Sequence, residues 1–190
     1  MEPFSPILTP RLSLREFFKK DAPALLNACR QSPAIAAMHS HQLTGPGPVR
    51  RYLDCLTREY SRGLHRTLAV ALLPDDKLVG MISLQIHPAF PRGEIGYWIA
   101  PDFQGRGLAS EAAKALVEYG FREQQLHRIQ GMHFPENPAS GRVLQNAGMR
   151  YEGTLKDYVL VDGEWKDCLM YAAVITESSS APDMQKDASR

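Results

Sequence analysis

The residues best suited to chemistry lie in the run from Glu94 to Ala109, EIGYWIAPDFQGRGLA. Its first part, residues 94–100, is rich in β-branched and aromatic side chains, which predicts a buried strand that ends at Pro101. From Ala109 onward, apolar residues recur at the spacing typical of an amphipathic helix. The segment 104–107 therefore lies where a strand turns into a helix.

A Gly-rich junction of this kind can hold phosphate. Gly105 and Gly107 lack a Cβ atom, so backbone N–H groups can turn toward a ligand, and the helix start adds unsatisfied donors and the positive end of its dipole. A pyrophosphate would fit there, although the two glycines could also serve only the turn. The dinucleotide fingerprint is not matched, because Ser110 stands at its third glycine position and residues 128–134 carry no acid. The junction also lacks the Gly-Lys-Ser/Thr of a Walker A loop.

The rest of the chain predicts the elements that must position this junction. Apolar periodicity and turn residues predict seven strands and four helices in one mixed sheet, without an internal repeat or a domain linker. The expected strands cover residues 11–17, 67–73, 78–86, 94–100, 128–134, 149–160 and 165–174. The expected helices run from Ala22 to Arg30, from Pro48 to Gly63, from Ala109 through Gly120, and from Pro138 to Gly148, with Asp21 and Asn137 as N-caps. Asp162-Gly163 predicts a hairpin between the last two strands.

Composition bounds the class of protein. The chain has 190 residues, of which 44% are hydrophobic and 23% charged, and this suits one globular domain. We expect that domain to span residues 1–176 and residues 177–190 to form a disordered tail. A formal net charge of +1 argues against direct nucleic-acid binding, and the three cysteines and six histidines show no metal-ligand spacing. Because no signal peptide or membrane span is evident, we expect a cytoplasmic protein.

Gln104-x-x-Gly107-x-Ala109 resembles the Q/R-x-x-G-x-G/A acetyl-CoA signature of the GNAT N-acetyltransferase superfamily. The resemblance extends beyond this short pattern to residues 8–175. It is similar to the RimJ/RimL branch, the ribosomal-protein N-terminal acetyltransferases and their relatives. The similar stretches are LTPRLSLREFFKKDAPALL, GYWIAPDFQGRGLASEAAKALVEYGF, HRIQGMHFPENPASGRVLQNAGMRYEG and the final hairpin.

The resemblance implies a mixed α/β, GNAT-like fold in the order β-α-α-β-β-β-α-β-α-β-β, whose seven-stranded sheet splays open at an acetyl-CoA site. The implied cofactor contacts lie on the strand end, the Gly-rich junction, the helix start and an N-x-x-S segment. They are Trp98, Ile99, Ala100, Gln104, Gly105, Arg106, Gly107, Leu108, Ala109, Ser110, Asn137 and Ser140. A backbone N–H near Ile99 is the expected donor to the acetyl oxygen. The side chains of Tyr97 and Ile99 could also belong simply to the core, and Asn137 could serve only as a helix cap.

Acetyl transfer also needs a neutral amine, and an acceptor whose reference pKa is about 8 to 10.4 is mostly protonated at neutral pH. The position of Glu94 resembles the one from which many family members project a catalytic glutamate, so we expect it to act as a general base through water. The weaker competitors are Asp157, Glu164 and Asp167. Leu144 stands where RimI-type enzymes carry the tyrosine that protonates the departing thiolate, so Ser140 or water is the expected proton donor.

These features together predict an acetyl-CoA-dependent N-acetyltransferase that forms a ternary complex and transfers acetyl directly to a primary amine. The resemblance favours a protein N-terminal α-amine as acceptor, while small-molecule amines stay open. The loops 31–47 and 155–166, which border the acceptor side, hold no dense acidic cluster of the kind a polycationic aminoglycoside favours. The alternative from another class is a non-catalytic acyl-CoA sensor or interaction module. We expect no membrane partner and a monomer or homodimer.

Overall fold

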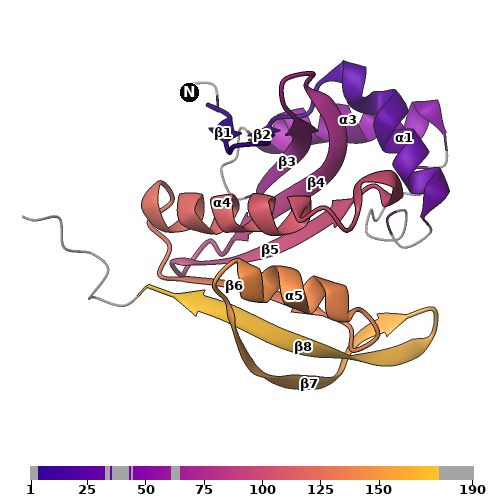
Figure 1. Ribbon diagram of the computed structural model, residues 1–190. Coiled ribbons are helices and arrows are strands. Elements are labelled where there is room, and N and C mark those ends of the chain that lie inside the picture. The colour runs from indigo at the N-terminus through magenta and orange to yellow at the C-terminus, as the bar shows by residue number, and fades with distance from the viewer. Residues whose placement is uncertain (1–3, 33–34, 36–42, 44, 61–64, 176–190) are drawn as a thin grey trace, which may run out of the picture.

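In the described part of the chain, one mixed sheet of eight strands organises the protein, in the order β1-β2-β3-β4-β5-β6-β8-β7 (Figure 1). The structure is a computed structural model that describes residues 4–32, 35, 43, 45–60 and 65–175. The strands are β1 Ile7–Leu8, β2 Leu12–Arg15, β3 His65–Leu72, β4 Lys77–Ile86, β5 Arg92–Ile99, β6 Arg128–His133, β7 Arg150–Val161 and β8 Glu164–Val174. The described helices are α1 Ala22–Gln31, α3 Pro46–Tyr60, α4 Leu108–Arg122 and α5 Pro138–Asn146, with short 3-10 helices at Lys19–Asp21 and Pro101–Phe103.

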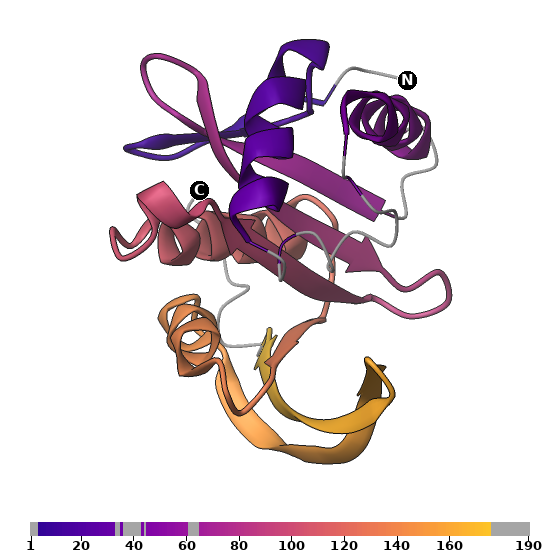
Figure 2. The same ribbon diagram turned by 90° about the vertical axis from the view of Figure 1, so that its right-hand side faces the viewer.

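Helices cover both faces of the sheet. Successive side chains of a strand point to opposite sides, and in β4 apolar side chains on both sides are buried. On β4, Met81 faces α3, where Tyr52 Oη lies 3.7 Å from its Sδ, whereas Leu84 on the other face lies against Gly120 of α4. A Cβ at Gly120 would lie 2.5 Å from Ile129 Cδ1, so this glycine lets α4 approach β6 closely. Figure 2 shows the result, with α1 and α3 on one side of the sheet and α4 and α5 on the other.

The sheet splays open between β5 and β6. These two strands are parallel and pair over three residues only, from Arg92 opposite Arg128 to Glu94 opposite Gln130. Beyond Glu94, β5 stays paired with β4, and β6 stays paired with β8, both in antiparallel fashion. The facing edges of β5 and β6 therefore diverge from Glu94 onward, which confirms the splayed GNAT-like sheet predicted above.

β7 and β8 form a long hairpin that curls away from the rest of the sheet (Figure 2). Asp162 and Gly163 turn it with φ angles of 49° and 83°, the left-handed pair that a tight two-residue hairpin requires. The sequence prediction of a hairpin at this dipeptide is confirmed. The pairing of β7 with β8 shifts at Glu152 and again at residues 156–158, and such bulges bend a strand.

Among the residues that the structure describes, the sheet has eight strands, one more than the seven that the sequence predicts. The additional strand, β1, contains only Ile7 and Leu8, which pair with Leu14 and Ser13 of β2. Two residues are too few to show an alternating pattern, so β1 gave no periodic signal. Thr9 holds the connection, because its Oγ1 accepts a hydrogen bond of 2.9 Å from the Leu12 N–H.

Asp21 stands at the N-cap position of α1, as the sequence predicts, but its side chain does not cap the helix. Its carboxylate instead accepts two hydrogen bonds from the Arg15 guanidinium, at 2.8 and 3.0 Å, and one of 2.7 Å from the Phe18 N–H. A buried carboxylate is stabilised most by a cation, and Arg15 on β2 is close enough to serve. The predicted N-cap depends on Asp21 and the helix that follows it, whereas the partner that its carboxylate binds lies on the preceding strand.

Several predictions made from sequence fall on residues that the structure does not describe. They are the tail at 177–190, most of the loop 31–47, and the expected helix end at Gly63. The helix itself, α3, begins at Pro46, two residues before the expected Pro48. Among the helices of the described residues, none is both long and apolar enough to cross a membrane.

Candidate functional site

A pocket of about 470 Å³ lies where β5 separates from β6. Its walls come mainly from the end of β5, the Gly-rich junction, the first turn of α4 and one face of α5 along its whole length, and Figure 1 shows these helices on either side of the separation. Most residues that the sequence predicts for the cofactor line it. They are Trp98, Ile99, Gln104, Gly105, Gly107, Leu108, Ala109, Ser110, Asn137 and Ser140.

The Gly-rich junction presents backbone donors to this pocket. Gly105 and Gly107 have φ angles of 73° and 74°, in the left-handed region that only glycine adopts at little cost. Gly107 is the N-cap of α4, and within the described part of the chain no side chain caps it. The first intrahelical hydrogen bond joins the Glu111 N–H to the Gly107 oxygen, so the N–H groups of residues 108–110 precede the helical ladder.

Gln104 ties this junction to the strand before it. Its Nε2 donates a hydrogen bond of 2.8 Å to the Ile99 oxygen. The Ala100 N–H donates in the opposite direction, to Val79 of β4, at 2.8 Å. Because backbone groups alternate along a strand, the N–H groups of Ile99 and Tyr97 point toward the gap between β5 and β6.

Tyr97 spans the gap with its side chain. Its Oη lies 2.8 Å from both the backbone oxygen and the Oγ of Ser140, on the first turn of α5. Burial raises the pKa of Tyr97 to about 12, against a lowering by the hydrogen bond with Ser140. The phenol therefore keeps its proton at neutral pH, beside the serine that the sequence singles out.

The first turn of α5 is fixed by Asn137. Its Oδ1 accepts a hydrogen bond of 3.2 Å from the Ser140 N–H, so Asn137 is a helix cap that also lines the pocket. At the other end of α5, Asn146 Nδ2 donates to Ser110 Oγ at 3.1 Å. This second bond joins the end of α5 to the first turn of α4, beside the pocket.

Two of the predicted cofactor residues do not line the pocket. Ala100 points its N–H toward β4, as described above. Arg106 is exposed, and its guanidinium donates to the Asp102 oxygen at 2.8 Å and lies 5.3 Å from the centre of the Phe103 ring. Its backbone oxygen accepts a hydrogen bond of 3.0 Å from Arg11. In this arrangement Arg106 stabilises the shape of the junction.

Glu94, the predicted base, lies outside the pocket, at the point where the gap begins. It is the last β5 residue paired with β6, and it lines a separate cavity of about 200 Å³ together with His87, Arg92 and Gln130. Gln130 Nε2 donates to Glu94 Oε2 at 3.1 Å. The carboxylate is thus half-buried at the vertex of the two diverging strands.

Two of the three competing carboxylates on the final hairpin, Asp167 and Glu164, are already engaged with cations. Lys156 Nζ lies 2.6 Å from Asp167, and it holds the pKa of that carboxyl below its usual range together with the Asp157 N–H. Lys166 does the same for the exposed Glu164, at 2.6 Å. A carboxylate with a lowered pKa is a weaker base, so the pairing with lysine makes Asp167 and Glu164 poor candidates for accepting a proton.

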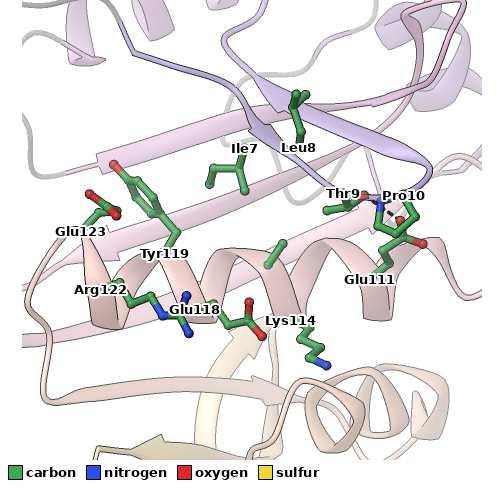
Figure 3. Close-up of a pocket in the computed structure, with 11 residues that line it drawn as sticks. Ile7, Leu8, Thr9, Pro10, Glu111, Lys114, Glu118, Tyr119, Arg122 and Glu123 are labelled. Atoms are coloured by element: carbon green, nitrogen blue, oxygen red, sulfur yellow. Dashed lines mark hydrogen bonds between the residues drawn. The ribbon is translucent and has the colours of Figure 1, made fainter. Parts of the chain in front are cut away.

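A larger groove, of about 660 Å³, runs along the exposed face of α4 next to β1 (Figure 3). Its lining includes none of the residues that the sequence predicts for chemistry. At one end Glu111 is held by Thr9 Oγ1 and Arg11 Nε, each at 2.6 Å. These contacts tie α4 to the segment that follows β1, and they explain the groove as a seam between two elements.

Further pocket residues were missed by the sequence analysis. For Tyr97 the sequence offered only a possible place in the core, because its position in an apolar strand gives no hint of a partner in α5. The others are Ser32, Ile35, Phe103, Ala139, Arg142, Val143 and Asn146. The four from α5 follow the Asn137 cap with helical spacing, and that regularity could have identified the face of α5 that turns toward the pocket.

Comparisons with known proteins agree with this geometry. The sequence model of the acetyltransferase (GNAT) domain matches residues 11–150. An uncharacterized N-acetyltransferase of Bacillus subtilis, YnaD, is 33% identical over 90% of this chain and 98% of its own length. The [ribosomal protein uS5]-alanine N-acetyltransferase of Escherichia coli is 37% identical over 52% of this chain and 53% of its own length. Mycobacterium smegmatis RimJ, solved in complex with CoA-disulfide, is 26% identical and superposes with a TM-score of 0.73 over 90% of each chain. The chain therefore belongs to the GNAT family of acetyltransferases and is similar to its RimJ/RimL branch.

Proposed function

We propose that this protein transfers the acetyl group of acetyl-CoA directly to the α-amine of a protein N-terminus. The observation that carries the proposal is the pocket itself, which joins a Gly-rich helix start to the unpaired edge of β5. Support for the cofactor comes from RimJ of M. smegmatis, which was solved with a CoA-disulfide. Support for the acceptor comes from the E. coli relative, whose name gives an alanine of ribosomal protein uS5.

The residues present suit the diphosphate of coenzyme A. A Cβ added at Gly105 would meet nothing within 4 Å, and one at Gly107 would come no closer than 3.6 Å, to Arg11 Nη2. The space beside both glycines is therefore open, and the N–H groups of residues 108–110 border it at the positive end of a 15-residue helix. A side chain at either position would occupy the space where a phosphate approaches these donors.

Acetyl-CoA would supply a thioester whose carbonyl oxygen becomes negative during transfer. The N–H groups of Ile99 and Tyr97 point into the gap and are the donors that would stabilise this charge. The Gln104 side chain donates to the Ile99 oxygen. The Ile99 N–H therefore faces the gap as a donor, while the neighbouring carbonyl oxygen is already hydrogen-bonded. This assigns Gln104 a positioning role within the cofactor site.

Glu94 is the base that would neutralise the acceptor through water. It lies at the vertex of the gap, on the side of the sheet opposite to α4 and α5, because side chains at 94 and 95 point to opposite faces. Ile95 contacts the side of Gly131 that also faces Leu144 of α5. The cofactor and the amine would then meet from opposite faces of the sheet.

Ser140 is the residue best placed to donate a proton to the departing thiolate. Tyr97 can donate to either the backbone oxygen or the Oγ of Ser140, and a bond to Oγ leaves the serine hydrogen free to face the pocket. Because a thiol has a reference pKa of about 8.5, its thiolate leaves with little assistance. The replacement of the RimI-type tyrosine by Leu144 is therefore compatible with turnover.

A first experiment tests the cofactor site by calorimetric titration of acetyl-CoA into the wild-type protein and Gly107→Val. We expect binding to the wild type and a dissociation constant at least about tenfold higher for the variant, because valine is strained at positive φ and fills the phosphate approach. Gly163→Val is a matched control, since Gly163 also has a positive φ, of 83°, and lies in the hairpin turn far along the chain. Unchanged affinity of Gly107→Val would contradict the placement of the diphosphate.

A second experiment tests the acceptor. Decapeptides that begin with alanine or serine are incubated with acetyl-CoA and the protein, and mass spectrometry scores the gain of one acetyl group. We expect the free peptides to gain it and the same peptides with a blocked N-terminus to gain none, even where they contain lysine. Acetylation of the blocked, lysine-containing peptide would redirect the proposal to side-chain amines. Tight acetyl-CoA binding without acetylation of any peptide would favour the non-catalytic acyl-CoA sensor.

A further inference from the structure

We infer that Gln130 is a positioning residue for the Glu94 carboxylate, at the end of a hydrogen-bonded chain that starts at Glu152 on the final hairpin. The inference rests on the proposed role of Glu94 as base. It adds a connection from β7 through β6 to β5 that no sequence motif indicates.

The chain has three links. The Glu152 carboxylate accepts two parallel hydrogen bonds from the Arg128 guanidinium, from Nη1 at 2.8 Å and from Nη2 at 2.5 Å. Arg128 Nε then donates to Gln130 Oε1 at 3.2 Å. Gln130 Nε2 donates to Glu94 Oε2 at 3.1 Å.

The geometry of the strands places these groups in one row. Arg128 and Gln130 are two residues apart on β6, so their side chains share a face of the sheet, and Gln130 is directly opposite Glu94. Ile129, between them, points to the other face, against Gly120 of α4. Glu152 is the extra residue of the first bulge in β7, and a bulge is able to re-aim a side chain away from its ladder position.

The direction of the hydrogen bonds is fixed by chemistry. A guanidinium can only donate, so Arg128 must face the oxygen of the Gln130 amide, and the amide NH2 must then face Glu94. Glu94 must in turn accept, which an ionised carboxylate does with either oxygen. The chain therefore sets the orientation of Gln130 and, through it, the orientation of the Glu94 carboxylate.

The bond from Gln130 also leaves room for the acceptor. It engages Glu94 Oε2, while among the described residues no hydrogen bond engages Oε1, which is left for water or the incoming amine. The other titratable groups near Glu94 are His87 and Arg92, in the same cavity, and the thiol of Cys168 on β8. Burial raises the pKa of Cys168, and nearby carboxylates, including Glu94, raise it further, so the thiol stays neutral.

The test measures turnover of the alanine-initiated decapeptide by wild type and Gln130→Leu between pH 5.5 and pH 9, a range of about 3.5 pH units that includes the reference pKa of the α-amine. We expect kcat to fall about tenfold, the cost of one hydrogen bond to a charged group, while KM for the peptide changes by less than about twofold. The dissociation constant of acetyl-CoA, measured by calorimetry, is expected to stay unchanged. A merely structural tie would lower the melting temperature without this selective loss of kcat.

Gln85→Leu is the matched control. Gln85 is opposite Glu94 on the β4 side and lines the same cavity, but among the described residues it is not a hydrogen-bond partner of Glu94. We expect its kcat to match that of the wild type. An equal loss of kcat in Gln85→Leu would overturn the specific role of Gln130.

A double-mutant cycle with Glu94→Gln separates this inference from the function on which it rests. If Gln130 acts through Glu94, Gln130→Leu lowers kcat in the wild type and has no further effect in the Glu94→Gln background. An equal loss in both backgrounds overturns the inference and leaves Glu94 as base. A Glu94→Gln variant with wild-type turnover overturns the base assignment, and the inference falls with it. If calorimetry detects no binding of acetyl-CoA to the wild type, the proposed function itself is contradicted.

Discussion

Two arginines of this protein make nearly the same hydrogen bonds in different surroundings. Arg15 on β2 binds the Asp21 carboxylate with both Nη atoms, at 2.8 and 3.0 Å, and binds Asp76 through Nε at 2.6 Å. Arg128 on β6 binds Glu152 with both Nη atoms and binds Gln130 through Nε. The side chains of Arg15 and Asp21 are 5% and 3% exposed, whereas those of Arg128 and Glu152 are 27% and 40% exposed.

This difference in burial separates a structural network from one available for catalysis. The Arg15 network joins β2, the turn after β3 and the start of α1, and its central pair, Arg15 and Asp21, is almost completely buried. The Arg128 network lies on the face of the C-terminal half of the sheet that is opposite to α5 and points toward the gap between β5 and β6. The same functional groups stabilise the fold in the Arg15 network and orient a carboxylate in the Arg128 network.

The largest expected effect on stability comes from breaking the buried network with Arg15→Leu. The substitution leaves the Asp21 carboxylate buried without its cation, which costs about 3–5 kcal/mol of the free energy of unfolding. Urea denaturation followed by circular dichroism measures this loss. Lys19→Leu is the control, because Lys19 is exposed and forms none of the ion pairs of the described residues. A loss below about 1 kcal/mol for Arg15→Leu would show that water or another group stabilises the Asp21 carboxylate when Arg15 is absent.

The sequence predicted most of the fold because the relevant signals are local. The strand β5, the Gly-rich junction and the apolar stripe of α4 follow one another along the chain, and each has its own periodicity or turn residues. β1 was missed because two residues carry no period. The side-chain role of Asp21 was also missed, because the competing partner Arg15 lies on the preceding strand and no spacing rule connects the two.

The candidate site divides in the same way. The backbone donors at residues 105–110 were predictable, because the glycines and the apolar pattern that marks the helix start can be read directly from the sequence. The contact of Tyr97 with Ser140 joins residues 43 positions apart, and that of Gln130 with Glu94 joins residues 36 positions apart. Such pairs depend on strand register and on the position of α5, which one sequence does not encode in any short pattern.

A smaller effect, and one that depends on pH, is expected for Asp76→Asn in the Arg15 network. The hydrogen bond from Arg15 holds the pKa of Asp76 below its usual range, aided by Lys20. A carboxyl whose pKa is lowered on folding adds stability above its unfolded pKa, about 3.9, and this is lost as pH falls through the folded value. We expect Asp76→Asn to cost about 1 kcal/mol at pH 7, because the side chain is 32% exposed. Urea unfolding at pH 7 and at pH 3 should show the gap between wild type and variant closing at low pH; a gap independent of pH would contradict the assignment.

The smallest change in stability is expected for Arg128→Leu, the counterpart of Arg15→Leu in the open network. Exposed ion pairs contribute about 1 kcal/mol or less, so the free energy of unfolding should change by no more than that. Turnover of the alanine-initiated decapeptide should nevertheless fall about threefold, because the Gln130 amide can still donate to Glu94 but is no longer held in that orientation. Urea denaturation and kcat measured on the same preparation test both halves of this expectation. A stability loss as large as that of Arg15→Leu would show that burial does not distinguish the two networks, since both arginines would then support the fold alone.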